Sequence, residues 1–177
     1  MRNLTMMTDF YELTMSQAYY KAGKENEIAV FDAFFRKNPL NGGYGIMGGV
    51  DKIISYIQSI HFTDSDIEYL KNTGQFTDDF LNYLRNFKFT GSIYAIPDGT
   101  PVFGNEPIVT VKAPIIEAQI IETILLSYLN SNICYTTAAS RVVEAANPVG
   151  VMEFGARRAM GPDAAVEASK CAVIAGC

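Results

Sequence analysis

Apolar positions along this chain alternate between helical and extended spacing, which predicts a mixed α/β architecture. Recurrence every third or fourth residue indicates helices, and runs of β-branched and aromatic residues between Gly and Pro indicate strands. The expected helices lie within residues 9–22, 50–60, 62–70, 76–84, 115–146 and 162–171. The expected strands are residues 28–37, two or three short segments within 88–114, residues 149–154, and a second buried strand beginning in the final AVIAGC.

Helix-terminus signals support several of these boundaries. Thr8 or Asp9 can cap the first helix, and Gly23 can end it. The related segments FTDSDIEYL (62–70) and FTDDFLNYL (76–84) each place a threonine before acidic residues and an apolar pattern. That order is typical of a helix N-terminus, where the helix dipole favours acidic side chains. We therefore predict caps in these two segments, and no metal ligands.

The same patterns divide the chain into three parts. Residues 1–114 are interpreted as an N-terminal α+β domain, residues 115–148 as a connecting helical segment, and residues 149–177 as the first β/α unit of another domain. We expect the long helix to break near residues 130–132 and to end at Asn147–Pro148, because a residue before Pro disfavours helix. One β/α unit cannot close a barrel or cover both faces of a sheet. The sequence thus favours the front part of a larger α/β enzyme.

Composition narrows the class of protein. Apolar residues make up 49% and charged residues 19%, which indicates a folded chain, not a disordered one. A net charge of −5 argues against a general nucleic-acid surface. Three widely spaced cysteines give neither a disulfide framework nor a zinc motif, so we expect a cytoplasmic setting. We also expect no signal peptide and no transmembrane helix.

Two features suggest known catalytic or phosphate-binding motifs but do not fit them. The glycine-rich stretch NPLNGGYGIMGG (38–49) lacks GxxxxGK[ST] and a clean GxGxxG context, so a flexible strand-to-helix connection is the favoured interpretation. His61 is the single histidine, and it has no recognisable nucleophile or relay partner in a motif. We predict no metal site and no catalytic residue within this chain.

The strongest candidate chemistry lies in VMEFGARRAMGPDAA (151–165). The adjacent Arg157 and Arg158 follow the expected strand and precede a helix opened by Gly-Pro-Asp. Guanidinium groups bind phosphate or carboxylate in a bidentate way, and a helix N-terminus adds backbone N–H donors. The alternative is a structural ion pair with Glu153 or Asp163. The default place for Phe154 is the core, unless it points into a site at the strand end.

The chain resembles nicotinate phosphoribosyltransferase over nearly its whole length. The resemblance rests on several motifs in the right order: TDFYELTMSQAY (8–19), VFDAFFRKNP (30–39), FTGSIYAIPDGTPVF with NEPIVTV (89–111), APIIEAQIIETILL (113–126) and EFGARRAMGPDAA (153–165). It implies an N-terminal sandwich-like α+β domain that packs on an irregular α/β barrel, of which this chain holds only the first β/α unit. It also implies active sites at the interface of a head-to-tail homodimer.

The resemblance implies an activity as well. The family joins nicotinate to 5-phosphoribosyl 1-pyrophosphate, giving nicotinate mononucleotide and pyrophosphate in NAD salvage. ATP phosphorylates an active-site histidine, and Mg²⁺ acts on the pyrophosphate. By resemblance, Tyr11 is the aromatic residue that reaches the pyridine ring in the neighbouring subunit, and Phe154 is the opposite face of that stack. Arg157 is similar to a phosphate-contacting arginine, with Arg158 in support.

Some positions depart from the family pattern. Ser131 and Ala138 stand where relatives commonly carry a bulkier residue and a lysine, so residues 127–141 receive no ligand roles, although Arg141 matches. The resemblance places the phosphorylated histidine and most of the barrel beyond Cys177, so we expect this chain alone to be inactive. The alternative is a non-catalytic module that dimerises or binds a partner.

Overall fold

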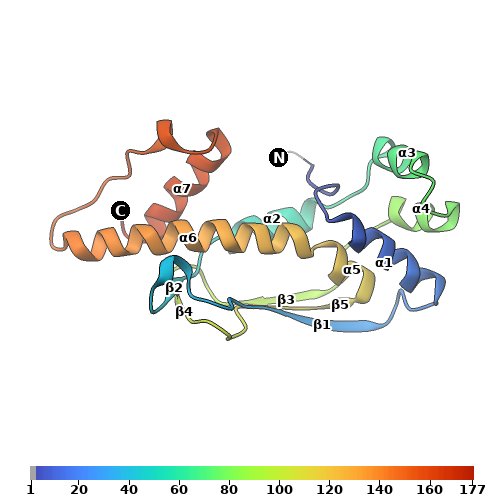
Figure 1. Ribbon diagram of the computed structural model, residues 1–177, viewed down its shortest axis with the longest axis horizontal. Helices are drawn as coiled ribbons and strands as arrows, with labels where there is room; N and C mark the ends of the chain where they lie inside the picture. The colour runs from blue at the N-terminus through green and yellow to red at the C-terminus, as the bar shows by residue number, and fades with distance from the viewer. Residues whose placement is uncertain (1–2) are drawn as a thin grey trace. The chain divides into compact units, whose positions relative to one another are not determined.

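Residues 3–177 of the computed structural model form both helices and short strands, which confirms the expected α/β class (Figure 1). The chain folds as two units that interleave in sequence. The first unit holds the residues up to Phe31, Lys52–Tyr94 and Thr110–Leu126. The second unit holds Asp32–Asp51, Ala95–Val109 and Ser127–Cys177.

The first unit is built on a three-stranded sheet with the order β1–β5–β3. These strands are β1 (Ile28–Ala33), β3 (Ser92–Ala95) and β5 (Val109–Pro114). On the central strand, Val111 and Ala113 are buried while Lys112 is exposed, which is the alternation of a half-buried strand. A Cβ on Gly91 would lie 2.3 Å from the Cβ of Ala113, so only glycine fits where β3 begins.

Helices of the first unit supply an aromatic core. They are α1 (Phe10–Lys21), α2 (Val50–Ser59), α3 (Asp64–Asn72), α4 (Asp78–Arg85) and α5 (Ile115–Ile120). Helix α1 packs against α5, and α3 packs against α4. Phe80 on α4 is fully buried, and its ring centroid lies 5.8 Å from that of Tyr20 and 5.9 Å from that of Phe76. Such offset and edge contacts add to the area that the rings bury.

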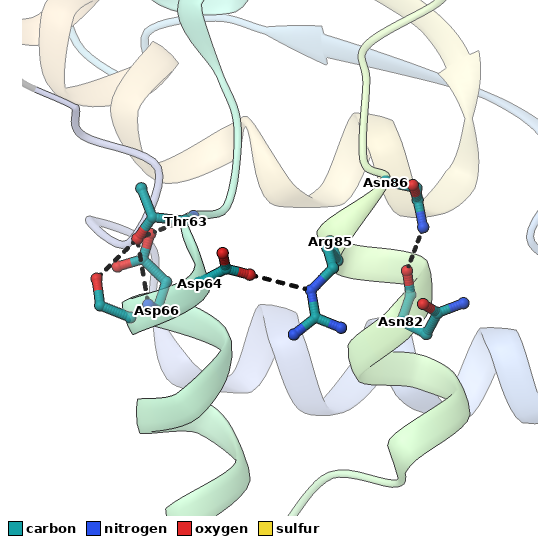
Figure 2. Close-up of polar contacts among 7 residues, drawn as sticks. Thr63, Asp64, Asp66, Asn82, Arg85 and Asn86 are labelled. Carbon is teal, nitrogen blue, oxygen red and sulfur yellow. Dashed lines mark hydrogen bonds and ion pairs between the residues drawn. The ribbon is translucent and has the colours of Figure 1, made fainter.

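Figure 2 shows how α3 begins and how it is joined to α4. The Thr63 hydroxyl accepts a hydrogen bond from the Asp66 N–H (3.2 Å), and the Asp66 carboxylate accepts one from the Thr63 N–H (2.8 Å). This is the capping box that the first FTD segment predicts. Thr77 is the N-cap of α4 but makes no such side-chain bond. Arg85 on α4 pairs with Asp64 through Nε at 3.3 Å.

The second unit packs the glycine-rich stretch against α6 (Glu122–Ala146). Its short 3₁₀ turn (Pro39–Asn41) leads to β2 (Gly45–Ile46), which pairs antiparallel with β4 (Pro101–Val102). The Ile46 N–H donates to the Thr137 hydroxyl at 2.8 Å, and a Cβ on Gly48 would lie 2.4 Å from the Thr136 hydroxyl oxygen. The stretch leads into α2, as expected for a strand-to-helix connection. Its residues 45–49 are buried against α6, however, so the prediction that the connection is flexible is wrong.

The predicted strand over residues 149–154 is wrong. These residues form no strand, and Met152 and Phe154 are 85% and 80% exposed. A strand requires a neighbouring strand to satisfy its backbone groups, and none within residues 3–177 pairs with this segment. The predicted strand start in AVIAGC is also wrong, because α7 (Pro162–Ile174) continues through its first three residues.

Two other boundaries differ from the prediction. The first strand ends at Ala33 and not at residue 37. The long helix is interrupted at Ile121, between α5 and α6, and runs unbroken through residues 130–132 to Ala146. Asn132 is accommodated because its Nδ2 donates to the Tyr128 carbonyl one turn earlier (2.9 Å). Its Oδ1 accepts the Cys171 thiol of α7 (3.2 Å).

Candidate functional site

The arginine pair lies on a short 3₁₀ turn of the second unit, η2 (Ala156–Arg158), which packs against α7. The turn is closed by a hydrogen bond from the Arg158 N–H to the Gly155 carbonyl (2.8 Å). Both arginine side chains are exposed. Gly161, the N-cap of α7, has φ +106°, a left-handed conformation that favours glycine and turns the chain into the helix.

Glu153 fixes the approach to this turn. Its carboxylate accepts a hydrogen bond from the Gly155 N–H and another from the Ser169 hydroxyl of α7 (3.1 Å). Within residues 3–177, neither Arg157 nor Arg158 forms an ion pair, so the structural pairing with Glu153 or Asp163 is not made. Two guanidinium groups are thereby left available to an anion.

The surroundings of the arginines are open. Phe154 is 80% exposed, so the expectation of a core position is wrong. A cavity of about 410 Å³ lies beside η2, lined mainly by apolar side chains: Ala156, Ala165, Val166, Ser169, Lys170 and Val173. Asp163 lies in the first turn of α7, where its negative charge interacts favourably with the helix dipole. Two guanidinium groups on one exposed turn have the chemistry to bind an anion.

Tyr11 belongs to the first unit, so it is not part of this turn. It lies in the first turn of α1 and is 48% exposed. The carboxylates of Glu122, Glu12 and Asp9, together with some burial, raise the pKa of the Tyr11 phenol, and Glu122 has the largest effect. At neutral pH the ring therefore carries an O–H group in an acidic environment.

The residue after Tyr11 carries a buried carboxyl group. Glu12 is 0% exposed, and its two oxygens accept hydrogen bonds from the hydroxyls of Thr8 and Thr123 (2.9 Å for Thr123). Burial raises the pKa of Glu12, the two hydroxyls oppose that rise, and the charges of Glu122 and Asp9 add to it. The Thr123 hydroxyl also accepts from the Asp9 N–H at 3.1 Å, so one residue of α6 binds both ends of this turn.

In the part of the chain that the structure describes, the single histidine and the three cysteines show no arrangement typical of a catalytic or metal site. The Nδ1 of His61 hydrogen-bonds the Ser59 carbonyl (2.7 Å), and its backbone N–H donates to the Thr5 hydroxyl (3.0 Å). The three cysteines are free thiols. Among residues 3–177, no group of three or more His, Cys, Asp or Glu side chains is arranged to hold a metal ion. No helix in that range has the length and apolar character to span a membrane.

The sequence patterns assign no role to three polar residues that make long-range contacts. Glu12 was hidden inside a helical pattern in which Glu is ordinarily exposed. Asp98 lies in a Pro-Asp-Gly turn, yet its carboxylate accepts the Val50 N–H at the start of α2 (3.2 Å). Arg141 donates to the carbonyls of Pro39 and Leu40, both at 3.4 Å. Only the family match at Arg141 gave any signal, because spacing along the chain does not reveal partners that are distant in sequence.

Comparison with known proteins gives a family match. The model of the nicotinate phosphoribosyltransferase (NAPRTase) N-terminal domain matches residues 6–130. The chain is 42% identical over 171 residues to nicotinate phosphoribosyltransferase pncB2 of Mycobacterium tuberculosis, covering 97% of this chain and 37% of that protein. It is 40% identical over 174 residues to the Bacillus subtilis nicotinate phosphoribosyltransferase, covering 98% and 36%. The chain thus spans little more than a third of these curated relatives.

Solved structures agree with the sequence match. The crystal structure of human nicotinic acid phosphoribosyltransferase superposes with a TM-score of 0.88 at 29% identity, covering 96% of this chain and 35% of that one. A nicotinate-nucleotide pyrophosphorylase structure from Pyrococcus furiosus gives a TM-score of 0.75 at 23% identity, which shows a shared fold alone.

Proposed function

The chain belongs to the nicotinate phosphoribosyltransferase family, and on that premise we propose that it supplies the N-terminal part of an enzyme of NAD salvage. The reaction joins nicotinate to 5-phosphoribosyl 1-pyrophosphate and releases pyrophosphate. Negative charge develops on the pyrophosphate leaving group as the anomeric carbon of the ribose becomes cationic. Cationic groups fixed beside that leaving group stabilise the transition state.

The observation that carries this proposal is the exposed arginine pair on η2. Within residues 3–177, Arg157 and Arg158 have no carboxylate partner, while Glu153 and α7 hold the backbone of their turn. A guanidinium group that is not already paired can bind a phosphate oxygen pair in bidentate fashion. We assign Arg157 to the phosphoribosyl pyrophosphate and Arg158 to a supporting contact.

The aromatic residues complete the proposed substrate site. We assign Tyr11 and Phe154 to opposite faces of the nicotinate pyridine ring. In a homodimer, Tyr11 would contact the pyridine ring bound in the neighbouring subunit. Both rings are exposed, as such a role requires, and offset stacking supplies the contact. No catalytic group of the reaction is assigned within this chain.

ATP, Mg²⁺ and a cytoplasmic setting enter the proposal by family resemblance. The described side chains do not fit a Mg²⁺ site of their own, because residues 3–177 gather no set of three ligating side chains. What this chain contributes is substrate binding and orientation.

A chimera tests this function. Residues 1–177 replace the matching N-terminal 36% of the Bacillus subtilis relative, and the assay follows nicotinate mononucleotide formed from nicotinate, ATP and phosphoribosyl pyrophosphate. We expect turnover that depends on both substrates, with the unmodified relative as the positive control. A chimera that is soluble, melts cooperatively and gives no product would contradict the proposal and favour the non-catalytic module.

A further inference from the structure

The first turn of α1 is held in an unusual way. Asp9 is the N-cap of α1, yet its side chain makes no capping hydrogen bond. Its backbone N–H donates instead to the Thr123 hydroxyl, which belongs to the second residue of α6 (3.1 Å). A helix start normally finds its partners within its own segment, so this turn depends on a residue 114 positions away.

Glu12 closes the arrangement from inside. Its Oε1 accepts a hydrogen bond from the Thr123 hydroxyl and its Oε2 accepts one from the Thr8 hydroxyl, so one carboxyl group joins the residue before the N-cap of α1 to the start of α6. The directions of both hydrogen bonds at Thr123 are set by its partners. The Thr123 oxygen accepts from Asp9 N–H, and its hydrogen is donated to Glu12. We call Thr8, Asp9, Glu12 and Thr123 the α1 clamp.

Burying the Glu12 carboxyl group costs free energy unless other interactions compensate for the lost hydration. A carboxyl group removed from water loses its hydration, and only hydrogen bonds or a cation repay that loss. The charged side chains that act on Glu12 in the described part of the chain are Asp9 and Glu122, both acidic. An apolar residue would fill the same space without this cost, so the carboxyl group is best explained by the bonds it makes.

We propose that Glu12 is a positioning residue for Tyr11, and that the α1 clamp fixes the ring which the proposed function places against the nicotinate pyridine ring. Tyr11 lies between Asp9 and Glu12, so both sides of its backbone are tied to Thr123. Among the groups that raise the pKa of its phenol, Glu122, the neighbour of Thr123, has the largest effect. The inference rests on the proposed function for the substrate, but the clamp itself does not.

The first test uses the 177-residue chain. Ring-labelled tyrosine gives one set of NMR signals for each of the ten tyrosines, and Tyr11→Phe identifies those of Tyr11. Glu12→Ala should shift the Tyr11 signals, while Glu12→Gln should leave them near their original positions, because an amide can hydrogen-bond both threonines. Glu68→Ala, an exposed glutamate of α3, is the matched control and should move nothing.

A second variant covers the case in which Glu12→Ala fails to fold. Thr123→Val keeps the side-chain shape and removes the hydroxyl that joins Asp9 to Glu12, so it should shift the same Tyr11 signals. A folded Glu12→Ala or Thr123→Val chain whose Tyr11 signals stay in place would overturn the clamp.

The chimera separates the clamp from the substrate role. Glu12→Ala should raise KM for nicotinate by roughly tenfold while KM for phosphoribosyl pyrophosphate stays within about twofold, and Glu12→Gln should restore most of the loss. If the Tyr11 signals shift but KM for nicotinate does not change, the ring contact assigned to Tyr11 is wrong while the clamp stands. A chimera without any activity would instead contradict the proposed function.

Discussion

At the scale of single residues, burial affects the pKa values of the Glu12 and Asp98 carboxyl groups more than neighbouring charges do. The pKa of Glu12 and that of Asp98 are both raised, and in both cases desolvation by burial is the largest cause. Hydrogen bonds oppose the rise, from Thr8 and Thr123 to Glu12 and from backbone N–H groups of residues 49 and 50 to Asp98. Each carboxyl group ties together segments that are far apart in sequence.

The pH dependence of stability should report the burial of Glu12. A folded-state pKa above the unfolded one means that the folded state binds the proton more tightly. This tighter proton binding adds to the free energy of unfolding. The contribution is fully present below the unfolded-state pKa and is lost as the pH rises through the folded-state pKa. Glutamine does not titrate, so the free energy of unfolding of Glu12→Gln should increase relative to that of the parent chain as the pH rises above the unfolded-state pKa of about 4.3.

Urea denaturation of the two proteins at several pH values measures this difference. Glu68→Gln removes an exposed carboxyl group and serves as the control, for which the smaller change is expected. A Glu12→Gln difference that stays flat or shrinks with rising pH would contradict the described environment of Glu12.

At the scale of elements, the two FTD segments offer a matched comparison. Thr63 and Thr77 are both N-caps, but only Thr63 forms the reciprocal bonds with the residue three positions on. Thr63→Ala should therefore lower the free energy of unfolding by about 1 kcal/mol, and Thr77→Ala by clearly less. Thermal or urea unfolding of the two variants decides the matter, and equal losses would mean that the capping box adds nothing.

The contact between β3 and β5 gives a second prediction at this scale. A Cβ at Gly91 would meet the Ala113 Cβ at 2.3 Å and the Lys112 carbonyl oxygen at 2.7 Å, and both belong to a strand that cannot easily move. We expect Gly91→Ala to cost about 1–3 kcal/mol of stability, as overpacking does. At Gly43 a Cβ would meet nothing within 4 Å, so Gly43→Ala is the control and should be nearly neutral. Similar urea midpoints for the two variants would refute the close approach.

Sequence patterns predicted elements well where local chemistry decides them. The helix starting near Asp9, the two FTD helices and the short strands within 88–114 all lie where their caps, periodicity and turn residues placed them. Residues 149–154 have the composition of a strand, but pairing depends on a neighbour that local sequence does not reveal. The same limit explains the site: adjacent arginines are visible in sequence, whereas a carboxyl group bound to a threonine 111 residues away is not.

For the whole molecule, apolar exposure is concentrated in one segment of the second unit. Met160, Met152, Phe154 and Val149 are 96%, 85%, 80% and 72% exposed, all within twelve residues. Clustered apolar surface of this kind favours association. We expect the 177-residue chain to self-associate at micromolar concentration in sedimentation velocity, and the double variant Met152→Ser/Met160→Ser to reduce it.

Tyr69→Ser is the control for that experiment, because Tyr69 is a 64% exposed aromatic residue in the first unit. It should leave association unchanged. If the parent chain sediments as a single monomeric species, residues 149–160 do not mediate self-association.

We propose that the arginine turn binds the phosphates of phosphoribosyl pyrophosphate, and the kinetics of Arg157→Ala in the chimera test this role most directly. Loss of a charge-assisted contact costs about 1.5–3 kcal/mol, so kcat/KM for phosphoribosyl pyrophosphate should fall roughly ten- to a hundredfold while Tm is unchanged. Arg157→Lys should recover only part, because lysine restores the charge without the planar fork. Arg85→Ala, which removes an exposed arginine of α4, should leave the kinetics unchanged. If Arg157→Ala lowers Tm and leaves kcat/KM intact, the turn is structural and the assignment is wrong.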